Sequence, residues 1–253
     1  MKKSAALLLV LFVICMGIAV AFGLPNLIPY SDQTIGSFIQ ETVPRLSICA
    51  FLIAFMMLHG YATTFKPKWR RVHLLWSIPC LFVAIANFPF VALLRGAAVI
   101  ERVDLLWLFL LKCIATALLE EILFRALVLP FFMERFEKNK YRALVSVLIS
   151  SALFALIHLV NLFFGAGVGE TMLQVGYTFL IGCMLAVMML KTENIWLCVI
   201  VHALFNVGGM IVTDLGSGPF QDTAFWILTA VFGLLCAVHI ILSLKNQRTG
   251  RRL

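Results

Sequence analysis

Charged side chains are scarce in this sequence. Asp, Glu, Lys and Arg make up 13% of its 253 residues, whereas hydrophobic residues make up 62%. An ordinary soluble domain has about a quarter of its residues charged and about half of them apolar. The mean hydropathy of +1.03 agrees with this imbalance. The composition therefore excludes a soluble globular protein and indicates a membrane protein.

The sequence also lacks the local patterns of disulfide-rich and zinc-binding proteins. Its cysteines stand inside apolar runs without Cys-x-x-Cys spacing, and no His-Glu-x-x-His segment occurs. Neither a disulfide framework nor a thiolate zinc site is indicated. We interpret the cysteines as packing residues. They are Cys15, Cys49, Cys80, Cys113, Cys183, Cys198 and Cys236.

Long linkers, low-complexity tracts and internal repeats are absent too. A single integral membrane domain is therefore predicted over residues 1–253. The missing inverted repeat also argues against a secondary transporter in which Glu120 would couple to protons.

What the sequence contains instead is a series of apolar runs. A transmembrane helix needs about 20 apolar residues, and eight candidate runs predict an all-α fold of about eight helices in one bundle. The first run is also compatible with a cleavable signal peptide, although it exceeds the usual hydrophobic region of about 7 to 15 residues. The runs are residues 5–22, 43–58, 74–94, 105–132, 144–164, 172–190, 195–212 and 224–244.

Basic residues are distributed unevenly between alternate connections. Fifteen of the 20 lie in one set of connections, whereas only Arg45, Arg95 and Arg102 lie in the other. Cytoplasmic loops carry the excess of Lys and Arg, so we expect a multi-pass protein of the cell membrane with both termini in the cytoplasm. The net charge of +8 then reflects loops that face anionic headgroups of the lipid bilayer, and no nucleic-acid partner is predicted.

Three ionisable side chains interrupt the fourth run: Glu120, Glu121 and Arg125. A charge near the bilayer centre costs at least about 2.5 to 3.5 kcal/mol, so such residues must neutralise one another or perform a task. Glu121 and Arg125 have the spacing and order of a favourable helical ion pair. Glu120 lacks such a partner because position 124 is Phe, and it points toward neighbouring helices.

Polar residues in two later runs lie at a similar predicted depth. His158 is in the fifth run, and His202 and Asn206 are one helical turn apart in the seventh. A rise of about 1.5 Å per residue places these three and Glu120 at depths of roughly 13 to 22 Å. Because polar residues in membrane helices face the bundle interior, we expect Glu120, His158, His202 and Asn206 to share one intramembrane cavity.

Such a set of residues fits hydrolysis of an acyl or peptide bond. A poorly solvated carboxylate with a histidine beside it can activate a water molecule, here through Glu120 and His158. His202 and Asn206 can donate hydrogen bonds to a developing oxyanion. Glu121 and Arg125 would hold the helix and Glu120 in orientation. No serine or cysteine nucleophile is required.

At these residues the sequence resembles a known family. Glu120-Glu121-x-x-x-Arg125, Phe154-x-x-x-His158 and His202-x-x-x-Asn206 are similar to the three motifs of the CPBP family, the CAAX-protease and bacteriocin-processing (Abi) intramembrane endopeptidases. The resemblance covers residues 105–212 as a catalytic core. It implies eight helices, a cavity open to the cytoplasm and the roles given above. It also favours a metal-free, glutamate-dependent reaction, with a divalent metal such as zinc as the alternative.

Two classes of function therefore remain open. The leading interpretation is an intramembrane endopeptidase that acts on a peptide or membrane-protein substrate, either prenylated or of the bacteriocin type. The alternative is a non-catalytic membrane scaffold of the same fold that binds a partner such as a sensor kinase or an export complex. A scaffold, however, gains nothing from Glu120 and His158 unpaired in lipid.

Overall fold

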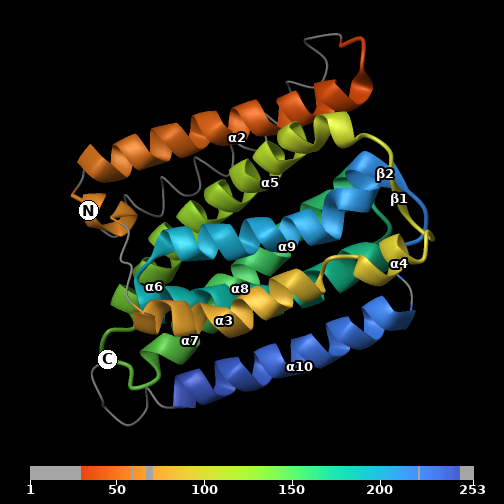
Figure 1. Cartoon of the computed structure of the whole chain (residues 1–253). Helices are drawn as coiled ribbons and strands as arrows, with labels where there is room; N and C mark the ends of the chain where they lie inside the picture. Colours follow the sequence, from red (N-terminus) through yellow and green to blue (C-terminus); the bar gives the residue numbers. More distant parts are fainter. Residues whose placement is uncertain (1–29, 59, 67–70, 222, 246–253) are drawn as a thin grey trace.

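The computed structural model describes residues 30–58, 60–66, 71–221 and 223–245, and helices make up most of them. The long helices run in similar directions and form a bundle (Figure 1). The α-helices are α2 (Gln33–Leu58), α3 (Arg71–Ala86), α4 (Phe90–Leu94), α5 (Leu106–Glu121), α6 (Leu129–Arg135), α7 (Arg142–Leu156), α8 (Val168–Thr192), α9 (Ile195–Leu215) and α10 (Thr223–Lys245).

The all-α membrane class is confirmed. Five helices in the described part of the chain are long and apolar enough to cross a membrane. They are Gln33–Leu58, Arg142–Phe164, Val168–Thr192, Ile195–Leu215 and Phe225–Leu244. The total of eight spans stays a prediction, and the run 5–22, with its signal-peptide alternative, lies outside the described residues.

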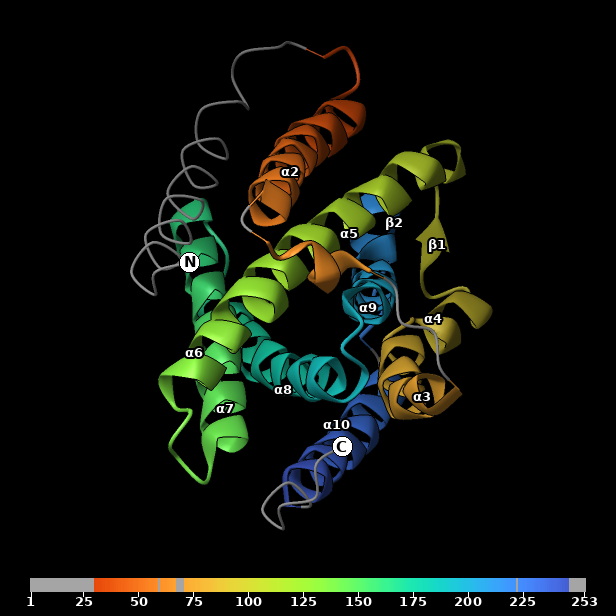
Figure 2. The same cartoon turned by 90° about the vertical axis from the view of Figure 1, so that its left-hand side faces the viewer.

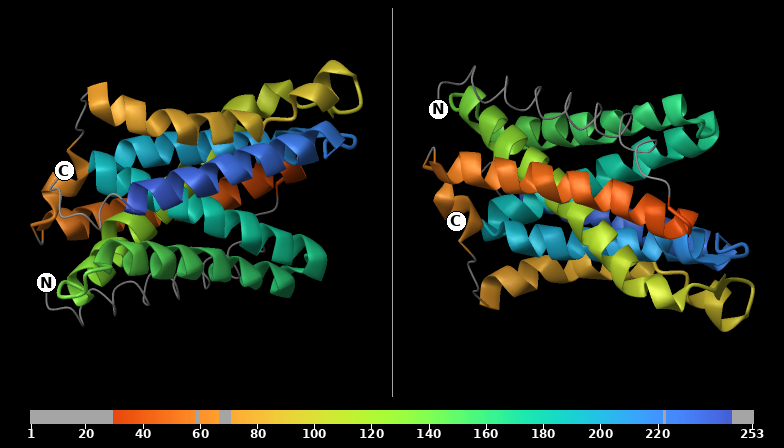
Figure 3. Two further views of the ribbon diagram at one scale, coloured as in Figure 1. Left: turned by 90° about the horizontal axis from the view of Figure 1, so that it is seen from below. Right: turned by 90° about the horizontal axis from the view of Figure 1, so that it is seen from above.

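Helix α9 occupies the middle of the bundle. It packs against α5, α3 and α8, whereas α2 covers α5 and α10 covers α3 and α8 (Figures 2 and 3). The buried residues of α9 include apolar side chains along most of its length, such as Ile195, Val201 and Ile211. A polar residue on the buried face of α9, such as His202, is therefore enclosed by neighbouring helices.

The run predicted over residues 105–132 is helical but not one regular α-helix. Its central part, Ile122–Val128, is a π-helix between α5 and α6. Pro130 follows at the start of α6, where it lacks an N–H and its ring crowds the carbonyl group one turn earlier. A widened turn accommodates this conflict, and such π-helical turns are frequent at functional sites.

Two of the apolar runs have other boundaries in the structure, and both contain proline. The run expected over residues 74–94 consists of two helices, α3 and α4, that are separated at residues 87–89. The physical reason is Pro89, which cannot donate to the helix and disfavours helical geometry at the residue before it. Helix α2 begins at Gln33 rather than at position 43, and Pro44 lies inside it.

The six cysteines in the described part of the chain are buried and unpaired, in agreement with a packing role. Cys80, Cys183 and Cys198 lie within one apolar cluster between α3, α8, α9 and α10.

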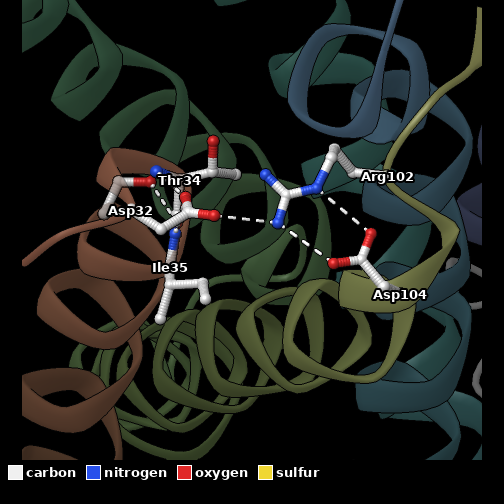
Figure 4. Close-up of polar contacts among 6 residues, drawn as sticks. Asp32, Thr34, Ile35, Arg102 and Asp104 are labelled. Carbon is white, nitrogen blue, oxygen red and sulfur yellow. Dashed lines mark hydrogen bonds and ion pairs between the residues drawn. The ribbon is translucent and has the colours of Figure 1, made fainter.

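Short strands and an ion-pair cluster join elements at one end of the bundle. Strand β1 (Val99–Ile100) pairs with β2 (Gly216–Ser217) in antiparallel register. Arg102 donates to Asp32 and Asp104 and thereby connects the start of α2 to the segment before α5 (Figure 4). Hydrogen bonds from Arg102 hold the pKa values of both carboxyl groups below their usual 3.8.

A second polar cluster lies deeper between α2, α5 and α9. The buried Lys112 ammonium is 3.0 Å from Asp214 Oδ2 and 3.2 Å from Glu41 Oε1. Both carboxylates lie within helices, Asp214 in α9 and Glu41 in α2, because these helices extend beyond the apolar runs 195–212 and 43–58. They provide the negative charge that a buried lysine requires.

Candidate active site

The two adjacent glutamates occupy the end of α5, directly before the π-helix. Successive helical residues point about 100° apart, and the two side chains accordingly differ in exposure. Glu121 is fully buried, whereas 25% of the Glu120 side chain is exposed. Glu120 is thus the carboxylate that can meet a substrate or water.

His202 lies between the two glutamates and connects α9 to α5. Its Nδ1 atom is 2.8 Å from Glu121 Oε1, and its Nε2 atom is 3.3 Å from Glu120 Oε2. The first distance is that of a strong hydrogen bond, and the second is longer than a typical one. The His202 side chain is almost completely buried. Glu121 therefore fixes the ring, while Glu120 holds it only loosely.

Arg125 completes the buried charge set. Its Nε atom lies 3.1 Å from Glu121 Oε2, which confirms the predicted ion pair, although the two atoms are not aligned for a hydrogen bond. Its Nη2 atom donates weakly to the carbonyl oxygen of Gly182 at 3.4 Å. The guanidinium carbon also lies 4.9 Å from the centre of the Phe154 ring, within the range of a cation–π interaction.

Phe154 is the common neighbour of both histidines. The ring centres of His158 and His202 lie 5.3 Å and 5.9 Å from that of Phe154, and both pairs are edge-to-face. His158 Nδ1 is 3.0 Å from the Phe154 carbonyl oxygen. Because a carbonyl oxygen only accepts, Nδ1 must carry the proton and a neutral His158 exposes the lone pair of Nε2.

The structure therefore brings together some of the predicted residues more closely than others. Glu120, Glu121, Arg125 and His202 form one connected set, and His158 joins it only through Phe154. Asn206 lies one turn beyond His202 on α9 and is partly buried. Its amide has no hydrogen-bond partner within the part of the chain that the structure describes.

Sequence reasoning missed two supporting features. Sequence analysis identified Phe154 only as the first residue of the motif that ends at His158. In the structure Phe154 contacts Arg125 and both histidines. Gly182 leaves room for this ring, because an added Cβ atom would lie 3.1 Å from Phe154 Cδ1. The only available signal for Phe154 was its position one turn before His158. Nothing in the sequence indicated Gly182.

The geometry also bears on metal binding. Among the described residues, no group of three or more His, Cys, Asp or Glu side chains is arranged to hold a metal ion. The His202 cluster joins a single histidine to two carboxylates, and one of these, Glu121, already faces Arg125. The His202 cluster in this arrangement does not fit a zinc site of the usual tetrahedral kind.

Comparison with known protein families found a match. Residues 102–208 match the family described as type II CAAX prenyl endopeptidase Rce1-like, and the matched segment contains every candidate site residue. The match confirms the resemblance to the CPBP family and suggests a CAAX-type intramembrane protease activity. The comparisons with curated proteins and with solved structures gave no match.

Proposed function

From the Rce1-like segment at residues 102–208, we propose that this protein is an intramembrane endopeptidase that hydrolyses a peptide bond with water activated by Glu120 and His158. The observation that carries the proposal is the placement of Glu120. It is a partly exposed carboxylate beside buried histidine, arginine and glutamate side chains, at a depth where an unpaired charge is expensive.

Glu120 and His158 offer two proton acceptors to one water molecule. The hydrogen bond from His158 Nδ1 to the Phe154 carbonyl oxygen leaves Nε2 as an acceptor. Within the described part of the chain, the Glu120 carboxylate has one long polar contact, with His202, and retains free lone pairs. A water between them can be oriented by His158 and deprotonated by Glu120.

His202 and Asn206 supply the hydrogen-bond donors for the oxyanion. The Nε2–H group of His202 is held loosely by Glu120 at 3.3 Å, so it can be shared with an oxygen that gains negative charge. The Asn206 amide lies one turn away on the same helical face. Two donors fixed on a buried helix require little reorganisation as the charge develops.

Glu121 and Arg125 hold the ring of His202 and balance its charge. With His202 protonated, two carboxylates face two cations and the buried set is neutral. A neutral His202 would leave one net negative charge in an apolar environment, which is less favourable. The proposed role of His202 therefore uses hydrogen bonds from both ring nitrogens, one to Glu121 and one to the oxyanion.

The proposed reaction balances without any further reactant. The water oxygen bonds to the carbonyl carbon of the substrate while one water proton passes to Glu120. The oxyanion accepts hydrogen bonds from His202 and Asn206. The C–N bond then breaks, and Glu120 returns the proton to the leaving amine. The products are a carboxylic acid, which keeps the second water proton, and an amine, and Glu120 is again ionised.

The matched family favours a prenylated peptide as the substrate, with an unmodified membrane peptide as the second candidate. The membrane orientation in this proposal has both termini in the cytoplasm, and basic connections such as residues 135–142 face the cytoplasm as well.

The scaffold alternative has no structural observation in its favour.

The direct test is cleavage of farnesylated and matching unmodified peptides by the purified protein in detergent, with products identified by mass. We expect cleavage of farnesylated peptides near their carboxyl end, unaffected by a metal chelator. Loss of turnover in Glu120→Ala, His158→Ala and His202→Ala variants that remain folded would support the assigned roles. Absence of cleavage by the wild-type protein, combined with tight peptide binding, would favour a scaffold.

A further inference from the structure

Asn87 makes a long-range contact with the candidate site. It follows α3 directly, before the break at Pro89, and lies outside the segment matched by the family. Its Nδ2 atom donates a hydrogen bond of 2.8 Å to the carbonyl oxygen of Phe205 on α9. Phe205 is the residue before Asn206, so the bond holds the backbone immediately beside the proposed oxyanion donor.

Two glycines on α9 permit this contact. A Cβ atom at Gly208 would lie 2.9 Å from the backbone of Asn87 and Phe88, and one at Gly209 would lie 2.9 Å from Asn87 Nδ2. Any residue larger than glycine at either position would push residues 87–88 away from α9. Gly209 also lies three residues after Asn206 and shares a helical face with it, so the Asn87 amide lies over the turn that carries Asn206.

The end of α3 holds Asn87 in place for this role. The Asn87 N–H donates to the Val83 carbonyl oxygen, and the Phe88 N–H donates to that of Ile85. The backbone of Asn87 therefore continues the last turn of α3, while Pro89 directs the chain away into α4. The break in the third apolar run thus places an amide donor against α9.

Asn206 depends on its backbone for orientation. Its side chain has no hydrogen-bond partner among the residues described, in contrast to His202, which Glu121 anchors. We propose that Asn87 is a positioning residue for the peptidase reaction, acting through the α9 backbone to aim the Asn206 amide. This inference rests on the proposed function, because it assumes that Asn206 stabilises the oxyanion.

The test measures kcat and KM for peptide cleavage in two single variants that break the same contact from opposite sides. Asn87→Ala removes the donor, and Gly209→Ala places a methyl group against it. We expect each to lower kcat by about tenfold with little change in KM, within the hundredfold that a 1 Å misplacement can cost. The Asn87→Ala/Gly209→Ala double variant should be no slower than Asn87→Ala, because the smaller side chain makes room for the methyl group.

Gly233→Ala on α10 is the matched control, since nothing lies within 4 Å of the added Cβ atom. It should retain the wild-type kcat. Thermal unfolding of every variant separates loss of positioning from loss of folding. If Asn87→Ala is unstable, Gly209→Ala still tests the contact, because it disturbs the contact while the Asn87 side chain remains.

A double-mutant cycle with Asn206→Ala decides how Asn87 acts. If Asn87 acts through Asn206, Asn87→Ala should lower kcat no further once Asn206 is alanine. Fully additive losses, or a wild-type kcat in Asn87→Ala while Asn206→Ala is slow, would overturn the inference alone. A wild-type kcat in Asn206→Ala would overturn the oxyanion assignment and the inference with it.

Discussion

His202 and Glu121 are joined by a buried hydrogen bond of 2.8 Å between Nδ1 and Oε1. The bond joins the middle of α9 to the end of α5, and Phe154 packs against the edge of the same ring. An ionised carboxylate only accepts, so Nδ1 carries a proton and Nε2 is left to face Glu120. The predictions below follow from this arrangement and from its supports.

Glu121→Gln should lower kcat by about 10- to 100-fold with KM little changed, a loss comparable to that for other partners that orient a functional histidine. The glutamine has no negative charge to hold the His202 Nδ1–H group, and it leaves Arg125 without its countercharge. Steady-state cleavage of a farnesylated peptide checks this. Glu101→Gln, on the exposed segment beside Ser217, serves as the control and should cleave at the wild-type rate.

Arg125→Ala should destabilise the protein by about 3 to 5 kcal/mol, because it leaves Glu121 buried without its countercharge. Arg45→Ala is a matched control, since Arg45 has the same spacing from Glu41 but both side chains are about one-third exposed. It should cost at most about 1 kcal/mol. Chemical or thermal unfolding in detergent measures the stability of both variants. Equal losses of stability in Arg125→Ala and Arg45→Ala would contradict the role of burial in this ion pair.

Gly182→Ala should destabilise the protein by about 1 to 3 kcal/mol through overpacking. The added Cβ atom would lie 3.1 Å from both Phe154 Cδ1 and Ser151 Cβ. Because Phe154 supports both histidines, kcat should fall as well. Gly176→Ala, on the same helix but with open space around its Cβ, is the control and should leave stability and kcat unchanged. Equal stability of the two variants would show that α7 and α8 can separate freely.

The Asp32–Arg102–Asp104 cluster should make stability depend on pH below about 4. Arg102 holds the pKa values of both carboxyl groups below their usual 3.8, so the folded protein binds fewer protons than the unfolded chain in this range. The stabilisation is therefore complete above the usual pKa and is lost as the pH falls through the lowered values.

Comparison of the wild type with Arg102→Gln checks this pH dependence. The difference between their unfolding temperatures should be present at pH 6, shrink below pH 3.8 and decrease at high salt, since all three side chains are about one-third exposed or more. A difference that does not change between pH 6 and pH 2.5 would mean that Arg102 acts through packing alone.

The sequence was sufficient to predict the helical membrane class and to single out the side chains of Glu120, Glu121 and His202, which lie together in the structure. Polar and ionisable side chains inside apolar runs are rare enough that Glu120, His202 and Asn206 could be singled out by position alone. The i to i+4 spacing also predicted the Glu121–Arg125 pair, which the structure contains. These features depend on local periodicity, which the sequence carries directly.

Contacts between helices could not be predicted in the same way. Whether His202 meets Glu120, Glu121 or both depends on how α5 and α9 rotate against each other, and the apolar pattern leaves that rotation open. The π-helix at Ile122–Val128 and the break before Pro89 also redirect side chains. Asn87 therefore gave no signal in the sequence, although it contacts α9.

The central claim is that Glu120 transfers the proton in peptide hydrolysis, and the most direct measurement is kcat for Glu120→Gln in the purified protein. The glutamine keeps the shape and a hydrogen bond to His202 but cannot accept a proton. The account predicts a loss of about 10²- to 10⁴-fold in kcat with the wild-type unfolding temperature. A Glu120→Gln variant that cleaves the farnesylated peptide at the wild-type rate would contradict it.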